Sequence, residues 1–66
     1  MRVTVNGGDR ELPDGLGLVE LLEQLGLRPG TVVVEHNGAA LVRSELDGVV
    51  LADGDRLELV RAVAGG

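Results

Sequence analysis

The sequence predicts a small α+β domain in which one amphipathic helix covers one face of a β-sheet. Only one segment of the 66 residues has the periodicity of a long helix, whereas several short segments alternate in polarity or are rich in Val. Asn-Gly and Asp-Gly pairs separate these short segments, and such pairs favour tight turns between strands. One helix cannot cover both faces of a sheet, so we expect two layers with one face of the sheet partly open.

The start of the chain predicts a β-hairpin. Val3 and Val5 alternate with polar neighbours and therefore share one face of a strand. Residues 6–8, Asn-Gly-Gly, suit the positive φ angles of a tight turn. We expect the second strand at residues 10–13, with Pro13 closing it or lying at a sheet edge because proline lacks a backbone donor.

Residues 17–27 predict an amphipathic helix. Its apolar residues recur at intervals of three and four and form one stripe, which consists of Leu18, Leu21, Leu22 and Leu25. Gly17 is the expected N-cap, and Glu20 supplies half of a capping box. Gly26 then provides the left-handed residue of a Schellman ending, and Pro29 prevents the helix from continuing.

A second hairpin is expected after the helix. Residues 31–36 are rich in β-branched side chains and predict a strand. Asn37 and Gly38 follow as a turn, and residues 39–42 predict a short return strand.

The last part of the chain predicts one helical turn and a final strand. Ser44 is expected to cap the turn over residues 43–48. Asp53 and Gly54 form a further turn, after which alternation predicts a strand that runs to about Ala62.

A core of aliphatic side chains must hold this domain together. The chain has no Cys for disulfides and no Phe, Trp or Tyr, although 44% of its residues are hydrophobic. Val32 lies on a strand that offers apolar residues on both faces, so its side is not fixed by the pattern. The expected core residues are Val3, Val5, Leu18, Leu21, Leu22, Leu25, Val34, Leu57 and Leu59.

The charge of the chain disfavours several classes of partner. Eleven acidic residues against six arginines and no lysine give a net charge of −5. This charge disfavours nucleic acid and anionic membranes and favours a basic protein partner. The opening residues alternate, so we expect no signal peptide, and no run reaches membrane-spanning length. We therefore expect a cytoplasmic protein.

No pattern in the sequence predicts an active site or a metal site. His36 is the only histidine and has no Cys to share a metal, so we expect a surface residue beside a turn. The acidic pairs, Asp53 with Asp55 and Glu45 with Asp47, lack the other ligands of a calcium loop. We therefore expect this chain to bind no metal and no cofactor of its own.

The last four residues, 63–66, are expected to form a flexible tail after a domain of residues 1–62. Gly65 and Gly66 bring no side chain to bury, so a narrow pocket on another protein can admit them where any Cβ would clash. If ATP adenylates the carboxylate of Gly66, sulfur or an amine can attack the unhindered carbonyl. From the residues alone, an idle frayed end and an enzyme's substrate are equal interpretations.

Seven pieces of the chain together resemble one protein family. In order, they are VTVNG, LPDG, LVELLEQLGL, VVVEHNG, VRSEL, LADGDRLELVRAV and the terminal GG. Their order, spacing and total length resemble the ThiS family, the sulfur carriers of thiamine biosynthesis among the ubiquitin-like β-grasp proteins. The resemblance implies a mixed sheet of four or five strands wrapped around one main helix, plus a short helical turn. It also implies that the first and last strands are parallel at the centre of the sheet.

The resemblance further implies the chemistry of the tail. A ThiF/MoeB-like adenylyltransferase would use ATP and Mg²⁺ to adenylate Gly66, and it would recognise Val63, Ala64 and Gly65 in its pocket. A cysteine desulfurase relay would supply sulfur for a thiocarboxylate. A ThiG-like thiazole synthase would accept that sulfur. The chain would then be a protein co-substrate rather than an enzyme.

A partner surface is expected on the open face of the sheet beside the tail. Val33, Val60 and Ala62 are candidates for an apolar patch, with Glu58 and Arg61 among the charges around it. The acceptor of the sulfur lies outside this chain. Three alternatives therefore stay open: a MoaD-like carrier for molybdopterin, a carrier for tRNA thiolation or another metabolite, and a ubiquitin-like modifier or binding module.

Overall fold

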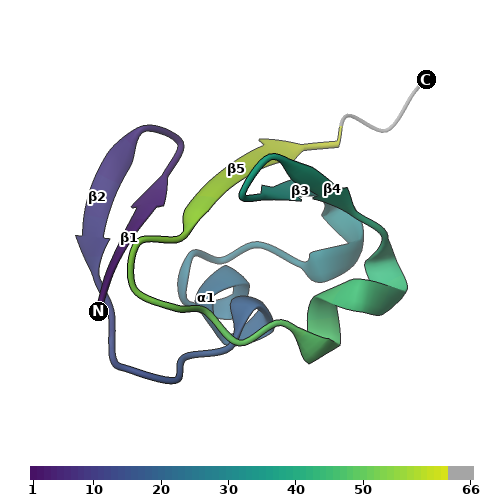
Figure 1. Ribbon diagram of the computed structural model, residues 1–66. Helices are drawn as coiled ribbons and strands as arrows, with labels where there is room; N and C mark the ends of the chain where they lie inside the picture. The colour runs from purple at the N-terminus through teal and green to yellow at the C-terminus, as the bar shows by residue number, and fades with distance from the viewer. Residues whose placement is uncertain (63–66) are drawn as a thin grey trace.

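A five-stranded mixed sheet wraps around one helix in the computed structural model, which describes residues 1–62 (Figure 1). The strand order is β2-β1-β5-β3-β4, with β1 and β5 parallel at the centre and the other neighbours antiparallel. The predicted β-grasp architecture is confirmed, while the predicted tail, residues 63–66, lies outside the described residues. The elements are β1 (Arg2–Val5), β2 (Gly8–Glu11), α1 (Leu18–Gln24), the 3₁₀ helix η1 (Pro29–Thr31), β3 (Val32–His36), β4 (Ala39–Leu41), the 3₁₀ helix η2 (Arg43–Gly48) and β5 (Arg56–Arg61).

Two Asn-Gly turns set the register of the two hairpins. Both residues of each turn have positive φ, 50° and 82° at residues 6–7 and 52° and 85° at residues 37–38, as a type I′ turn requires. Because the first turn uses only two residues, pairing resumes at once between Val5 and Gly8. The prediction of a second strand at residues 10–13 is therefore wrong by two residues at each end, and β2 ends before the proline.

The helix begins and ends as its sequence predicts. At its start, the Glu20 carboxylate accepts a hydrogen bond of 3.1 Å from the backbone N–H of the N-cap glycine. At its end, Gly26 has φ of 74° and donates to the carbonyl of Glu23 at 3.0 Å. The next N–H, that of Leu27, donates to the carbonyl of Leu22 at 2.8 Å. These two bonds complete a Schellman motif.

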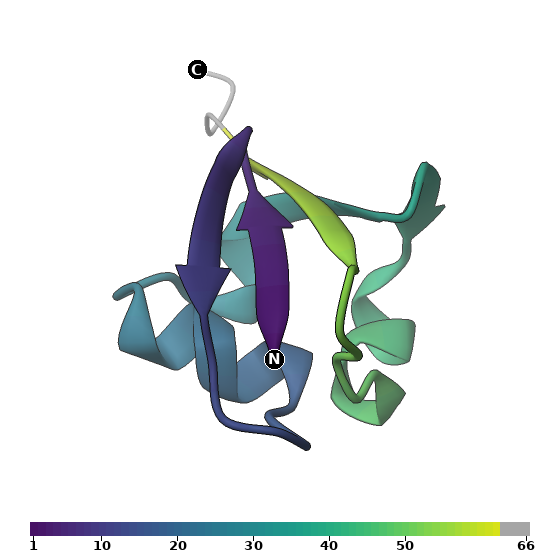
Figure 2. The same ribbon diagram turned by 60° about the vertical axis from the view of Figure 1, so that its left-hand side comes forward.

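The core lies between α1 and the inner face of the sheet (Figures 1 and 2). Val5 and Leu25, expected in the core, are only partly buried and pack against its rim. Three further residues of the core, Leu16, Leu46 and Leu51, lie outside the periodic segments, and no pattern in the sequence predicts them. The buried apolar residues are Val3, Leu16, Leu18, Leu21, Leu22, Val34, Leu46, Leu51, Leu57 and Leu59.

The second helical turn is capped differently from the prediction. The N-cap of η2 is Val42, and Ser44 lies within the helix rather than before it. The Glu45 carboxylate takes the capping role, because it accepts a hydrogen bond of 2.8 Å from the N–H of Val42. A glutamate at the third helical position reaches back to the N-cap in this way without a serine.

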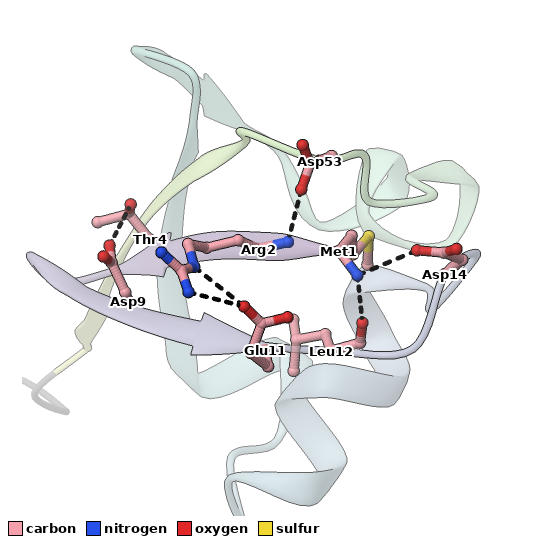
Figure 3. Close-up of polar contacts among 8 residues, drawn as sticks. All are labelled: Met1, Arg2, Thr4, Asp9, Glu11, Leu12, Asp14 and Asp53. Atoms are coloured by element: carbon pink, nitrogen blue, oxygen red, sulfur yellow. Dashed lines mark hydrogen bonds and ion pairs between the residues drawn. The ribbon is translucent and has the colours of Figure 1, made fainter.

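Polar pairs cover the outer face of β1 and β2 (Figure 3). Arg2 pairs with Glu11 at 3.0 Å, and the hydroxyl of Thr4 donates to Asp9 at 3.2 Å. These residues face each other across the β1–β2 ladder, and they are exposed or partly buried. Exposed pairs of this kind add little stability. They leave this half of the open face polar, whereas the exposed valines of β3 and β5, Val33 and Val60, lie on its other half.

Candidate functional site

The central strand β5 leads directly to the tail. Its residues alternate, with Leu57 and Leu59 buried and Glu58 and Val60 exposed, as the sequence predicts. Immediately after the strand, the N–H of Ala62 donates to the carbonyl of Thr31 at 2.8 Å. We call Arg61 and Ala62 the root of the tail. This hydrogen bond holds the root to the rest of the domain up to the last described residue.

Asparagines of the two hairpin turns fix the position of β5. The Asn6 side chain accepts from the N–H of Leu59 at 2.7 Å and donates to the carbonyl of the same residue at 3.1 Å. It therefore extends the β1–β5 ladder beyond the last paired residue of β1. The side-chain oxygen of Asn37 accepts a hydrogen bond from the backbone N–H of Arg56 at 2.8 Å. The sequence indicates the turns but not these contacts, since both asparagines are explained by their positive φ alone.

Val33 and Val60 lie directly opposite each other across β3 and β5, on the open face of the sheet. They remain 49% and 60% exposed. On the same face, Glu58 lies directly opposite Glu35, and both are exposed. Like charges placed opposite each other destabilise a sheet slightly, so the glutamate pair does not stabilise the fold. Its negative charge favours a basic partner.

The other predicted surface residues are divided between the two faces. Ala62 is exposed just beyond the end of β5. Arg61 has the parity of Leu57 and Leu59, so it lies on the helix side of β5, away from the Val33 and Val60 pair. The predicted tail residues, 63–66, lie outside the described part of the chain. The structure therefore brings Val33, Val60 and Glu58 onto one face and places Arg61 on the other, while Ala62 lies just beyond the end of the strand.

Changing Val60 to Asp is expected to weaken binding to the adenylyltransferase that the sequence resemblance implies by about tenfold or more, because a charge would enter the expected apolar contact. Val50→Asp is the matched control, since Val50 is also exposed, at 65%, and pairs with Gly17 before α1 and not with a residue of β3 or β5. Isothermal titration of both variants with the enzyme checks the expectation. Equal affinities for Val60→Asp and Val50→Asp would place the contact elsewhere.

His36 is not the free surface residue that the sequence suggests. Its Nε2 lies 2.9 Å from a carboxylate oxygen of Asp55, which is 8% exposed. The same carboxylate accepts hydrogen bonds from the N–H of Ala52 at 2.9 Å and the side chain of Asn37 at 3.0 Å. The turn before β5 is thereby tied to the hairpin of β3 and β4. A turn-forming Asp is common, and nothing in its sequence context reveals its burial.

These contacts control the ionisation of Asp55. Burial by itself would raise the pKa of the Asp55 carboxyl, but the hydrogen bonds from His36, Ala52 and Asn37 outweigh burial, so the pKa lies below its ordinary value of 3.8. Because the folded pKa is depressed, the charged form stabilises the fold above about pH 4. That contribution is lost as the pH falls through the folded pKa.

Asp55→Asn is therefore expected to lower the free energy of unfolding by about 1–3 kcal/mol near neutral pH, as loss of bonds to a charged group does. The difference from the wild type should shrink as the pH falls below 3.8. Asp47→Asn is the control, because Asp47 is 73% exposed and lies 3.9 Å from Arg43. Urea denaturation as a function of pH measures both. A difference that does not change with pH would contradict the role of the Asp55 charge.

Two further findings concern the described residues, 1–62. No three or more His, Cys, Asp or Glu side chains in this part of the chain come together as metal ligands would. None of its helices is both long enough and apolar enough to cross a bilayer.

Comparisons with known proteins agree with the fold and with the resemblance in sequence. A crystal structure of the thiamine biosynthesis protein ThiS from Geobacter metallireducens has a TM-score of 0.84 and 35% identity, with both chains covered completely. A solution structure of a thiamine biosynthesis protein from the same organism gives a TM-score of 0.80 at 35% identity, over 100% of this chain and 88% of the other.

One relative is much longer than this chain. A thiazole synthase of Paramagnetospirillum magneticum is 33% identical over 66 residues, and this chain spans 20% of its length. The sequence model of the ThiS family matches residues 3–66, which include both terminal glycines. The chain therefore belongs to the ThiS family.

Proposed function

We propose that this chain is a sulfur carrier for thiazole formation in thiamine biosynthesis, with sulfur carried as a thiocarboxylate on Gly66. The observation that carries the proposal is the family match, which runs through the domain and on to Gly66. In the described residues, the position of β5 supports the proposal. The central strand leads to Ala62, whose N–H is hydrogen-bonded to the carbonyl of Thr31, and the tail follows directly in the sequence. The chain is then a co-substrate, and ATP and Mg²⁺ are bound by a ThiF/MoeB-like adenylyltransferase.

The proposed chemistry has two steps. A carboxylate oxygen of Gly66 attacks the α-phosphorus of ATP, and pyrophosphate leaves. Cationic groups and the magnesium ion of the partner enzyme stabilise the charge that develops. Hydrosulfide, released when a thiol reduces the persulfide of a cysteine desulfurase relay and itself ends in a disulfide, then attacks the acyl carbon. AMP leaves and the thiocarboxylate remains on Gly66. Glycine suits both steps because no side chain hinders its carbonyl.

Thiazole synthase is the proposed acceptor of the sulfur. The support is the thiazole synthase of Paramagnetospirillum magneticum, one fifth of which is similar to this chain. This observation favours the thiamine branch over a MoaD-like carrier for molybdopterin, over tRNA thiolation and over a ubiquitin-like modifier. The ThiS structures of Geobacter metallireducens favour the same branch.

ATP–pyrophosphate exchange tests the proposal. The adenylyltransferase of the organism that makes this chain should catalyse exchange only when the chain is present, since the carboxylate of Gly66 is the group that reacts. A variant that lacks Gly66 should give only the background rate. Equal exchange with the wild type and the shortened chain would defeat the carrier function and return the tail to an idle end.

A further inference from the structure

A groove lies where the end of α1 meets the end of β5. Its volume is about 340 Å³, and it opens to solvent on the helix side of the root of the tail. Two arginines line it, one following the Schellman ending of the helix and one ending the central strand. The lining residues are Gly26, Leu27, Arg28, Thr31, Arg61 and Ala62.

The two arginines of the groove have no carboxylate partner among the described residues. Arg2 and Arg43 each have a carboxylate oxygen within 4.0 Å, those of Glu11 and Asp47. Arg28 and Arg61 have none within that distance among residues 1–62, and their guanidinium groups donate no hydrogen bond there, as is also true of Arg10 and Arg56, which do not line the groove. In a chain with a net charge of −5, two guanidinium groups on one groove form a local positive site.

The backbone holds both arginines in place. The carbonyl of Arg28 accepts bonds from the N–H of Thr31 at 2.9 Å and from its hydroxyl at 2.8 Å. The carbonyl of Thr31 in turn accepts from Ala62, the residue after Arg61. Arg61 is also paired with Val32 in the β3–β5 ladder. The two side chains thus start from fixed points, which lowers the entropy lost when they bind.

The position of the groove limits which molecule fills it. Ala62 lines the groove and is followed in the chain by the tail, so a protein that takes the tail must approach this root. The Arg guanidinium matches a carboxylate by two parallel hydrogen bonds, and Leu27 offers an apolar wall beside it. At longer range, the negative net charge of the chain attracts a basic partner. The positive charge of the groove acts only at contact, within a Debye length, where it attracts a single carboxylate on that partner.

We propose that this groove binds a carboxylate side chain, Asp or Glu, of the adenylyltransferase that takes the tail. The inference rests on the proposed function, since it names a second contact of the same partner. The valine pair and the side chain of Arg61 lie on opposite faces of β5, so contacts at the pair and at the groove would hold the end of β5 from two sides.

Charge reversal tests the groove. Arg61→Glu and Arg28→Glu should each raise the Kd of the enzyme for the carrier about tenfold or more, because attraction becomes repulsion at contact. The KM for the carrier in pyrophosphate exchange should rise in parallel, with kcat changed less than about twofold. Arg61→Lys should keep part of the affinity. The melting temperature should stay as in the wild type, since both side chains are exposed.

Arg10→Glu is the matched control, because Arg10 is exposed on the edge strand β2 and undergoes the same change of charge. Its Kd should change less than about twofold. Groove variants that bind no worse than Arg10→Glu would overturn the inference while leaving the carrier function intact. Inhibition of carrier binding by millimolar inorganic phosphate would also overturn the inference if it occurred with the wild type and not with Arg61→Glu. That result would show that the groove binds a free anion. No exchange with the wild type would defeat the proposed function and this inference together.

Discussion

Replacing Gly65 with Val is expected to reduce ATP–pyrophosphate exchange by about 100-fold or more, because a branched side chain one residue before the reacting carboxylate displaces it from the α-phosphorus. Adding one residue after Gly66 should have the same effect, since the carboxylate then lies beyond the reactive position. Both changes leave every residue of the described core unaltered, so the melting temperature should remain nearly that of the wild type.

A matched glycine separates this effect from a general cost of adding valine. Gly48 in η2 has open space around the position of an added Cβ and does not have positive φ. Gly48→Val should therefore support exchange at the rate of the wild type. Exchange that survives Gly65→Val at a rate similar to that of Gly48→Val would show that the tail does not enter a narrow pocket.

Truncating Leu22 to Ala is expected to lower the free energy of unfolding by about 2–5 kcal/mol, the range for loss of a buried leucine side chain. Leu22 is fully buried on the inner stripe of α1. Domains of this size have few kcal/mol to spare, so a large part of the molecules should be unfolded at physiological temperature. Urea denaturation measures the change.

Val50→Ala is the control for this truncation, because Val50 is 65% exposed. Its effect should stay within about 0.5 kcal/mol. A free energy of unfolding for Leu22→Ala that equals the value for Val50→Ala would contradict the position of α1 against the sheet.

Periodicity predicts most of this fold because its elements are regular where they touch the core. The stripe of α1 and the alternation of β5 each give the buried face correctly. The Schellman ending and the two type I′ turns follow from single glycines and asparagines, whose conformational preferences are local.

Contacts between distant segments could not be predicted in the same way. Leu46 and Leu51 are buried because η2 and the loop after it fold back toward α1 and the loop before it, and neither residue belongs to a repeating pattern. The pairing of His36 with Asp55 joins residues 19 apart, and that of Asn6 with Leu59 residues 53 apart. Such contacts depend on the packed sheet, which a local pattern does not describe.

For the candidate site, the sequence predicts the valine pair on the open face but not the arginine groove. Alternation along β3 and β5 is enough to place Val33 and Val60 outside, and the ladder register then brings them together. Arg61 follows the same alternation to the other face, where it meets Arg28 only because the end of α1 lies beneath the end of β5. That meeting is a property of the tertiary fold.

The central claim is that Gly66 carries sulfur, and intact-mass spectrometry tests it most directly. The wild-type chain is incubated with the adenylyltransferase, ATP, Mg²⁺ and sulfide, and a parallel sample omits ATP. With ATP, we expect a mass increase equal to the replacement of one oxygen by one sulfur, located by fragmentation at Gly66. As a control, the same enzyme preparation is shown to adenylate a known carrier protein. An unchanged mass of this chain with that active enzyme and ATP would contradict the claim.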